Sequence, residues 1–442
     1  MTETVALAFS GGLDTTVCVP LLKEEYGYDE VVAVTVDVGQ PADEFAEAKE
    51  TADALGLDIH VVDAKAEFAS LALDAVRANA TYQGYPLGTA LARPVIASAI
   101  LSVAESEGCT GIAHGCTGKG NDQLRFEAVW RDSELEVIAP VRELGLTREW
   151  EKEYAAERDL PVEGGSGGDY SIDTNLWSRS VEGKELEEPS HVPGEEIYEW
   201  TDAPGSETEE ITLAFEQGYP VALNGEELEP VELIETLNDL AGSYGVGRTD
   251  AMEDRMLGLK VRENYEHPAA TTLLDAHAGL EDLVLTKEER SFKTTVDDEW
   301  AEKGYQGLVD GPLMGALDAF IAETNERVTG TVTVRFEGGQ ARVVGRESPY
   351  AVYSAEAASF NTEDVSGGIE QADATGVAKY HGFQERLATR TIETAKQSEG
   401  VTATDGGAVD ATDDAPERPT LGEESPLSGT DVDQTASEWE EH

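Results

Sequence analysis

The residues best suited to chemistry near the start of the chain form the segment FSGGLDTT, residues 9–16. Its glycine pair follows an apolar run and precedes a stretch with a helical pattern. The glycines therefore fall at a helix N-terminus, where free N–H groups and the helix dipole favour an anion. Glycine lets phosphate oxygens approach the backbone, and hydroxyl donors are added by Ser10, Thr15 and Thr16. The segment predicts a phosphate or pyrophosphate site; the alternative is a tight turn in which Asp14 caps the helix.

A second segment, HGCTGKGNDQLRFE at residues 114–127, combines three glycines with charged and amide side chains. The glycines open the backbone to a ligand, and Lys119 offers a compact positive charge. Arg125 follows Asp122 by one helical turn, so the two share a face, and an arginine can grip a carboxylate with two parallel hydrogen bonds. The alternative is a glycine-rich loop capped by Asn121 or Asp122, which does not explain Lys119 and Arg125 together. Neither segment has the spacing of the P-loop or of the dinucleotide-binding fingerprint.

An alternating pattern of strands and helices over residues 1–165 must position these two segments. Apolar and β-branched runs predict strands at residues 5–9, 31–36, 59–62, 111–114 and 135–138. Helical patterns cover residues 15–26, 43–55, 67–77 and 90–107, and a further helix opens near residue 121 or 122. This order predicts an α/β fold with a doubly wound parallel sheet. Ligands of such sheets lie beyond the carboxyl ends of the strands, where both segments fall.

The pattern changes after the glycine-rich run at residues 164–168, which indicates a domain boundary or a mobile loop. We expect an α+β domain over residues 166–363, with a strand pair, a hairpin and three helices; these are at residues 211–215, 221–223, 331–336, 341–344, 230–241, 268–278 and 287–302. Residues 364–397 are expected to form a C-terminal arm with a helix at 384–396. Residues 398–442 are rich in acidic and small residues and cannot bury a core, so they are expected to be a disordered tail.

Charge is the strongest compositional feature, with 90 acidic and 31 basic residues and a formal net charge of −59. The acidic residues are spread along the whole chain, which favours adaptation to high salt over an acidic patch for a cationic partner. The chain has no cluster of Lys and Arg, which argues against nucleic-acid binding. Three scattered cysteines imply no disulfide framework. No signal peptide or transmembrane run is evident, so we expect a cytoplasmic protein that does not bind membranes.

The first segment resembles the pyrophosphate loop, SGG-x-D-[ST], of the ATP pyrophosphatase (PP-loop) superfamily. Together, residues 8–16 and 114–127 are similar to those of the argininosuccinate synthase family. Further agreement comes from YPLGTALARP, GVGR and GRESP, at residues 85–94, 245–248 and 345–349. The resemblance runs from about residue 4 to about residue 395 and implies an adenine nucleotide alpha hydrolase-like fold for the first domain.

The resemblance implies a carbon–nitrogen ligase of arginine biosynthesis that joins citrulline to aspartate. The ureido oxygen of citrulline attacks the α-phosphate of ATP, and the aspartate amine then displaces AMP from the citrullyl-adenylate. Mg²⁺ is implied as a partner of ATP, and a homotetramer as the assembly. No thiolate is needed, so Cys116 is interpreted as a packing residue, and His114 as a strand-end residue. The alternative is another adenylating PP-loop enzyme, one that modifies tRNA or forms an amide.

The resemblance also implies the roles of individual residues. The ATP site is expected to comprise Ala8, Phe9, Ser10, Gly11, Gly12, Leu13, Asp14, Thr15, Thr16, Val36 and Gly115. Aspartate is expected to contact Thr117, Asn121 and Asp122, the last through its amine. Citrulline is expected to contact Tyr85, Asn121, Arg125, Ser171, Ser180, Glu253 and Tyr265. The other candidates are Arg93, as a carboxylate anchor, and Lys119, and no residue is expected to form a dedicated metal site.

Several of these residues have plainer interpretations when the sequence is considered alone. Glu253 and Tyr265 lie in MEDRMLGLKVRENY, which is also typical of an amphipathic turn with a solvated glutamate. Ser171 and Ser180 have the surroundings of ordinary loop serines. Arg93 precedes a proline and is equally typical of a surface arginine at a helix start.

Overall fold

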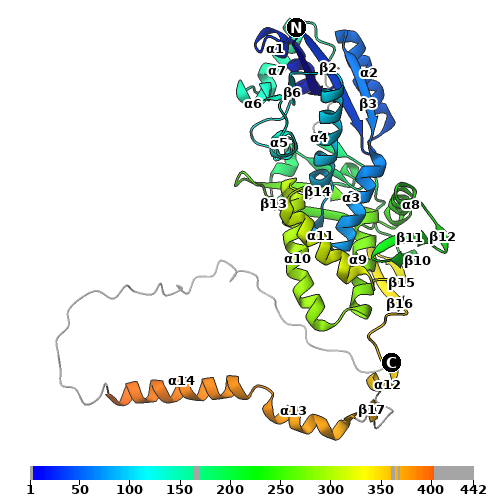
Figure 1. Cartoon of the computed structure of the whole chain (residues 1–442), viewed down its shortest axis with the longest axis vertical. Helices are drawn as coiled ribbons and strands as arrows, with labels where there is room; N and C mark the ends of the chain where they lie inside the picture. Colours follow the sequence, from blue (N-terminus) through cyan, green and yellow to red (C-terminus); the bar gives the residue numbers. More distant parts are fainter. Residues whose placement is uncertain (1–2, 163–169, 360–363, 367–368, 403–442) are drawn as a thin grey trace, which may run out of the picture. The chain divides into compact units, whose positions relative to one another are not determined.

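The computed structural model describes residues 3–162, 170–359, 364–366 and 369–402. Residues Met1–Tyr353 form one compact unit and Ser354–His442 a second. Within the first unit, the parallel sheet occupies one end and the sheet of β10, β11, β15 and β16 the other, with β13 and β14 between them (Figure 1). The predicted boundary at residues 164–168 lies outside the described residues.

The predicted doubly wound parallel sheet is confirmed. Its five strands have the spatial order β3-β2-β1-β6-β7, and all pairs are parallel. The strands are β1 (Thr4–Ala8), β2 (Glu30–Asp37), β3 (Asp58–Asp63), β6 (Gly111–Ala113) and β7 (Glu136–Ile138). Strand order reverses at β1, so β1 and β6 flank the switch point at which such sheets bind ligands. The two predicted ligand segments are the loops that follow these two strands.

Alternating burial explains why helices cover both faces of this sheet. On β1, Val5 and Leu7 pack into one apolar cluster, while Ala6 packs into another on the opposite face. The first cluster includes side chains of α1 (Leu13–Glu24) and α2 (Ala42–Leu55); the second includes α3 (Lys65–Arg77) and α4 (Thr89–Ser106). The remaining helices of this region are α5 (Asp122–Trp130), α6 (Pro140–Glu143) and α7 (Arg148–Glu157).

The expected α+β region is present, and its predicted strand pair and hairpin form one antiparallel sheet, β12-β11-β10-β15-β16. Its strands are β10 (Thr208–Glu216), β11 (Tyr219–Leu223), β12 (Glu226–Glu227), β15 (Gly330–Glu337) and β16 (Gln340–Glu347). The predicted helices are α8 (Pro230–Ser243), α9 (Pro268–Val284) and α10 (Lys287–Gln306), and α11 (Pro312–Asn325) was not predicted.

A second antiparallel sheet was also not predicted from the sequence. It has the order β13-β14-β9-β8 and consists of β8 (Ser171–Thr174), β9 (Arg179–Glu182), β13 (Arg248–Asp254) and β14 (Lys260–Glu266). A short ladder of β4 (Thr81–Tyr82) and β5 (Tyr85–Pro86) lies before α4 in the chain. Four predicted site residues lie on the four-stranded sheet, so this sheet and the parallel sheet together decide the geometry of the site.

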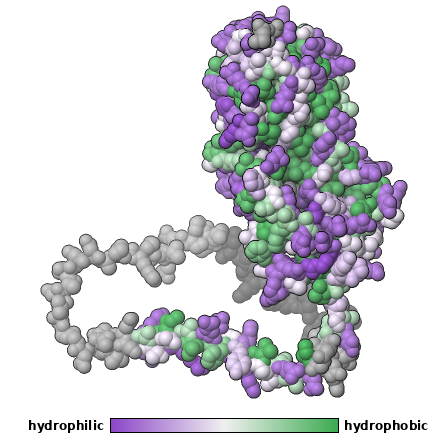
Figure 2. Space-filling view, in the orientation of Figure 1, coloured by the Kyte–Doolittle hydropathy of each residue, from purple (hydrophilic) through white to green (hydrophobic). Residues whose placement is uncertain are grey.

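The second unit contains the predicted C-terminal arm. Its elements are α12 (Ala355–Ala358), β17 (Asp364–Ser366), β18 (Ile369–Glu370), α13 (Ala374–Tyr380) and α14 (Phe383–Thr402). The arm helix α14 extends past residue 398, the predicted start of the tail, and the rest of the tail lies outside the described residues. Apolar side chains occur at intervals on the surface of this unit (Figure 2), including the exposed Val377, Tyr380, Phe383, Leu387 and Ile392. Across the described residues, no helix is both long and apolar enough to cross a membrane.

Candidate active site

A pocket of about 700 Å³ lies where the parallel sheet meets the four-stranded sheet, and both predicted ligand segments contribute to it. Among the described residues, its lining includes every predicted site residue except Gly11 and Thr16. Gly11 instead presses against α2, and Thr16 is fully buried with its hydroxyl donated to the Gly11 carbonyl at 3.2 Å. Gly11 and Thr16 therefore support the loop on the side away from the cavity, and the other predicted site residues line the cavity.

The glycine loop between β1 and α1 has the geometry of an anion site. Gly12 is the N-cap of α1 and no side chain caps the helix there. The alternative in which Asp14 caps the helix is therefore wrong, and the first N–H groups of α1 lack a side-chain acceptor. Gly11 has φ +77, and a Cβ at this position would lie 2.7 Å from Ala48 Cα. Only glycine fits this tight turn without a shift of α2.

Hydroxyl and carboxyl groups surround this loop. Thr15 Oγ1 donates to the Gly12 carbonyl at 3.2 Å and lies 3.2 Å from Ser10 Oγ. On α7, burial and then the charge of Asp14 raise the pKa of Glu151 to about 7. Near neutral pH, Glu151 therefore still carries a proton for part of the time.

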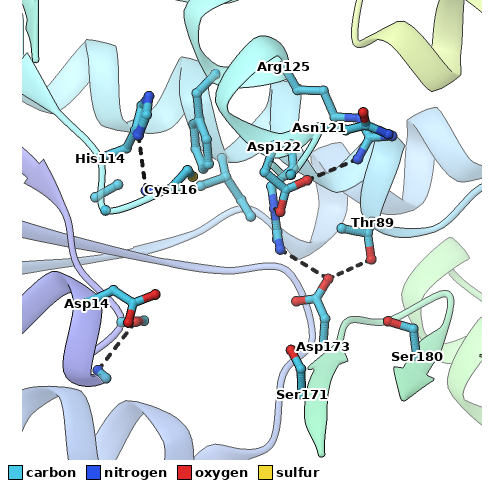
Figure 3. Close-up of a pocket in the computed structure, with 18 of the residues that line it drawn as sticks. Asp14, Thr89, His114, Cys116, Asn121, Asp122, Arg125, Ser171, Asp173 and Ser180 are labelled. Carbon is cyan, nitrogen blue, oxygen red and sulfur yellow. Dashed lines mark hydrogen bonds and ion pairs between the residues drawn. The ribbon is translucent and has the colours of Figure 1, made fainter. Parts of the chain in front are cut away.

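On the other side of the pocket, Asp122 at the start of α5 is paired with two arginines. Arg93 Nε donates to Asp122 Oδ2 at 2.9 Å, and Arg125 Nη1 donates to Asp122 Oδ1 at 3.0 Å. Burial acts to raise the pKa of Asp122, but the two guanidinium groups outweigh it and hold the pKa below its usual range. Arg93 also lies 3.1 Å from Asp173 on β8, which accepts a hydrogen bond from Thr89 at 2.5 Å (Figure 3).

This arrangement decides two of the sequence-based interpretations, one for Asp122 and Arg125 and one for Arg93. The shared face of Asp122 and Arg125 is confirmed by their ion pair. Arg93 lies within α4 with only 17% of its side chain exposed, so the interpretation as a surface arginine is wrong. Both carboxylates that it binds belong to this chain.

The histidine and cysteine of the second segment have structural contacts. His114 Nδ1 accepts a hydrogen bond from the Cys116 N–H at 3.2 Å, and its Nε2 lies 3.3 Å from Glu127. Burial raises the pKa of the Cys116 thiol, so the sulfur stays protonated and is a poor nucleophile. These contacts agree with the interpretation of both residues as non-catalytic.

A buried carboxylate with three phenol donors forms the far end of the pocket. Glu253 on β13 is only 4% exposed and accepts hydrogen bonds from Tyr85 at 2.6 Å, Tyr265 at 3.0 Å and Tyr305 at 2.6 Å. The rings of Tyr85 and Tyr265 stack with their centroids 4.5 Å apart. The interpretation of residue 253 as a solvated glutamate in a turn is therefore wrong.

The two predicted serines lie on strands, which corrects their interpretation as loop residues. Ser171 is on β8 and Ser180 on β9, and both line the pocket near Asp173 (Figure 3). Ser180 is paired in register with Tyr265 of β14. Strand alternation thus brings residues that are far apart in the sequence onto one face of the four-stranded sheet.

Comparisons with known proteins identify the family of this chain. The model of the arginosuccinate synthase N-terminal HUP domain matches residues 4–161, and that of the C-terminal domain matches residues 170–388. The argininosuccinate synthase of Natronomonas pharaonis is 79% identical over 393 residues, which cover 89% of this chain and 98% of that protein. This chain belongs to the argininosuccinate synthase family. The family members of Haloarcula marismortui and Methanococcoides burtonii are 72% and 55% identical, over 91% and 88% of this chain and 96% and 98% of theirs.

Membership of the argininosuccinate synthase family confirms the predicted enzyme class, an ATP-dependent ligase, and both predicted domain types. It does not favour the alternative of a tRNA-modifying or amidating enzyme. A solved U34-tRNA thiolase from Methanococcus maripaludis aligns at 18% identity over 38% of this chain and 60% of that one. Its TM-score of 0.26 is too low to support that alternative.

Some residues of this pocket were not predicted from the sequence. Asp173, Glu182, Arg255 and Glu263 all line it. Arg255 Nη2 donates to Glu182 at 2.8 Å and to Glu263 at 2.9 Å, while burial and then the charge of Glu253 raise the pKa of Glu263 to about 7. The sequence does carry a signal for these residues, because side chains two positions apart on a strand lie on the same face. Asp173, Arg255 and Glu263 each stand two positions from a predicted site residue, which is Ser171, Glu253 and Tyr265 respectively.

Proposed function

We propose that this chain forms argininosuccinate with ATP at the glycine-loop end of the pocket and the two amino acids at the other end. The observation that carries the proposal is that one continuous pocket joins an uncapped helix N-terminus to two separate carboxylates, Asp122 and Glu253. An anion with several oxygens fits the first end, and the ammonium groups of amino acids fit the carboxylates. The reacting atoms would then meet between the two ends.

In the first step, the citrulline ureido oxygen attacks the α-phosphorus of ATP, and the bond to the bridging oxygen of pyrophosphate breaks. Negative charge grows on the leaving pyrophosphate. N–H groups at the start of α1 and the neighbouring hydroxyls of Ser10 and Thr15 would stabilise this charge, Thr15 by turning its proton from the Gly12 carbonyl to a phosphate oxygen. Glu253, Tyr85 and Tyr265 hold citrulline, with the carboxylate opposite its α-ammonium group.

In the second step, the aspartate ammonium group loses a proton to solvent and the neutral amine attacks the ureido carbon of the citrullyl-adenylate. The bond between that carbon and the phosphate oxygen then breaks, and AMP leaves. Asp122 stays ionised between its two arginines and receives the aspartate ammonium group. Thr117 and Asn121 supply donors for the aspartate carboxylates. Holding three substrates in one orientation supplies much of the rate enhancement.

Mg²⁺ would be held mainly by phosphate oxygens. The part of the chain that the structure describes contains no group of three or more His, Cys, Asp or Glu side chains able to hold a metal. Asp14 lines the pocket beside the loop and is a carboxylate of the kind Mg²⁺ prefers. The ion would neutralise charge on the phosphates during transfer.

We also propose that the enzyme is a homotetramer that works at high salt in the cytoplasm. Exposed apolar residues on α13 and α14 support an assembly role for the arm, since a second chain could cover them. The net charge of −59 supports the high-salt setting. Light scattering in molar salt should give a mass four times that of one chain, and a monomer mass would contradict the assembly.

A product assay in molar salt tests the function. With ATP, citrulline and aspartate, the chain should release AMP, pyrophosphate and argininosuccinate in equal amounts, and none of them when citrulline is omitted. A heavy-oxygen label in the ureido group should appear in AMP, because that oxygen attacks the α-phosphorus. Formation of ADP, or AMP without the label, would contradict the proposal. Asp122→Asn purified in parallel controls for contaminating enzymes.

A further inference from the structure

Tyr305, in the last turn of α10, contacts three residues of the amino-acid end without lining the pocket itself. Its hydroxyl donates to Glu253 Oε1 at 2.6 Å and accepts a hydrogen bond from Asn121 Nδ2 at 2.8 Å. Its backbone carbonyl accepts from Arg125 Nε at 2.9 Å. Tyr305 is 1% exposed, so these contacts are shielded from water. One buried side chain therefore bridges residues that the proposed function assigns to both amino acids.

The hydrogen bonds of Tyr305 have one consistent direction. A phenol has a single proton, which goes to the carboxylate at 2.6 Å, so the oxygen must accept from Asn121. The other end of that amide, Asn121 Oδ1, accepts from the Met256 N–H at 3.1 Å. The amide is thus fixed in orientation from both ends. One N–H and one lone pair of Asn121 remain for a ligand.

The same reasoning shows which oxygen of Glu253 is left for a substrate. Oε2 accepts from Tyr85 at 2.6 Å and has a second phenol, Tyr265, at 3.0 Å; Tyr265 shares its single proton between this oxygen and Glu263 Oε2 at 2.8 Å. Among the described residues, Oε1 accepts only from Tyr305 and keeps one free position. The oxygen that Tyr305 orients is therefore the one available to an ammonium group.

The ring of Tyr305 is held in place, so its hydroxyl has a fixed position. It stacks on Tyr82 with centroids 3.6 Å apart and an interplanar angle of 8°. The guanidinium of Arg125, which is on α5, lies 5.0 Å from the centroid of the Tyr305 ring. We propose that Tyr305 is a positioning residue that sets Glu253 for citrulline and Asn121 for aspartate; the inference rests on the proposed function of the pocket.

Tyr305→Phe isolates the hydroxyl, because the ring stack, the contact with Arg125 and the backbone carbonyl all remain. Without the hydroxyl, Glu253 Oε1 loses a donor and Asn121 Nδ2 loses an acceptor, both in a buried setting. We expect the KM values for citrulline and aspartate each to rise roughly 10- to 100-fold. The dissociation constant of ATP, measured by calorimetry, should not change, since Tyr305 touches no residue of the glycine loop.

Tyr82→Phe is the matched control. It removes a hydroxyl from the other ring of the same stack, and that hydroxyl donates to the Asp254 carbonyl at 2.8 Å. Tyr305 also approaches this carbonyl, at 3.2 Å, so the control accounts for the loss of that contact. We expect wild-type KM values in Tyr82→Phe and a similar unfolding temperature for the two variants.

A double-mutant cycle adds a second readout that a general loss of stability would not give. If the Tyr305 hydroxyl acts through the Asn121 amide, Tyr305→Phe should change the KM for aspartate much less in an Asn121→Ala background than in the wild-type background. An undiminished effect there would overturn the inference. So would unchanged KM values in Tyr305→Phe, an equal loss of ATP affinity, or the same KM rise in Tyr82→Phe. A wild-type chain that makes no argininosuccinate would overturn the proposed function and this inference together.

Discussion

Replacing Asp122 with asparagine tests how the two half-reactions are divided within the pocket. Asp122→Asn keeps the shape of the side chain and removes the charge between Arg93 and Arg125. Both arginines keep another partner, because Arg93 still pairs with Asp173 and Arg125 still donates to the Tyr305 carbonyl. The site should therefore stay assembled while it loses the carboxylate that we assign to the aspartate ammonium group.

The size of the effect follows from the contacts. A hydrogen bond to a charged group contributes about 1.5–3 kcal/mol, and each 1.4 kcal/mol is tenfold, so the second step should slow about 10- to 150-fold at low aspartate. The Asp122 side chain is 30% exposed, so solvent weakens both ion pairs. We expect the free energy of unfolding to fall by about 1–2 kcal/mol, less than for a fully buried pair.

Two assays separate the half-reactions. Citrulline-dependent exchange of pyrophosphate into ATP needs no aspartate and should stay near the wild-type rate in Asp122→Asn. Argininosuccinate formation should fall by the factor given above. Asp282→Asn is a matched control. It breaks an exposed ion pair between Asp282 on α9 and Arg290 on α10 and should change neither rate. Equal losses in exchange and in argininosuccinate formation would refute the division of roles.

Three further predictions concern the glycine loop, the carboxyl pair of Asp14 and Glu151, and the acidic tail after Glu399. Gly11→Ala should lower both the unfolding temperature and the affinity for ATP, because φ at residue 11 is +77 and the added Cβ would clash with α2. Gly12→Ala is the control: its added Cβ would lie 3.4 Å from the nearest atom, Ser10 Oγ, so the unfolding temperature should not change. Equal unfolding temperatures for the two variants would contradict this prediction. Folding raises the pKa of Glu151 to about 7, so its stabilising contribution is complete below about pH 4.5 and is lost as pH rises through 7. Glu151→Gln should flatten that part of a melting-temperature profile against pH, and an unchanged profile would count against the assignment. Deleting the chain after Glu399 should leave product formation intact, and a collapse of activity would show that the acidic tail has a role in the fold or the site.

The parallel sheet and the position of its two ligand loops could be predicted because local signals are strong there. Consecutive buried residues on β1 and β2 give near-continuous apolar runs, and each glycine-rich loop directly follows a strand. The reversal of strand order at β1 then brings the two loops together. The position of each loop after its strand thus follows from local signals, whereas the meeting of the two loops depends on the pairing of β1 with β6.

The four-stranded sheet could not be predicted in the same way. Strands β13 and β14 read RTDAMED and KVRENYE, and their polar side chains face a polar pocket, so the usual alternation of apolar residues is absent. The burial of Glu253 depends on tyrosines from β5, β14 and α10, far apart in the sequence. Tyr305 shows the limit most clearly, because its role depends on Asn121, a residue 184 positions away.

The most direct test of the account is a structure of the chain with ATP and citrulline bound in molar salt. We predict the β- and γ-phosphates at the first N–H groups of α1, with Ser10 and Thr15 as hydroxyl donors, and the citrulline ammonium group at Glu253 Oε1. A triphosphate bound elsewhere, or citrulline away from the four-stranded sheet, would contradict the central claim that one pocket holds the leaving pyrophosphate at one end and the amino acids at the other.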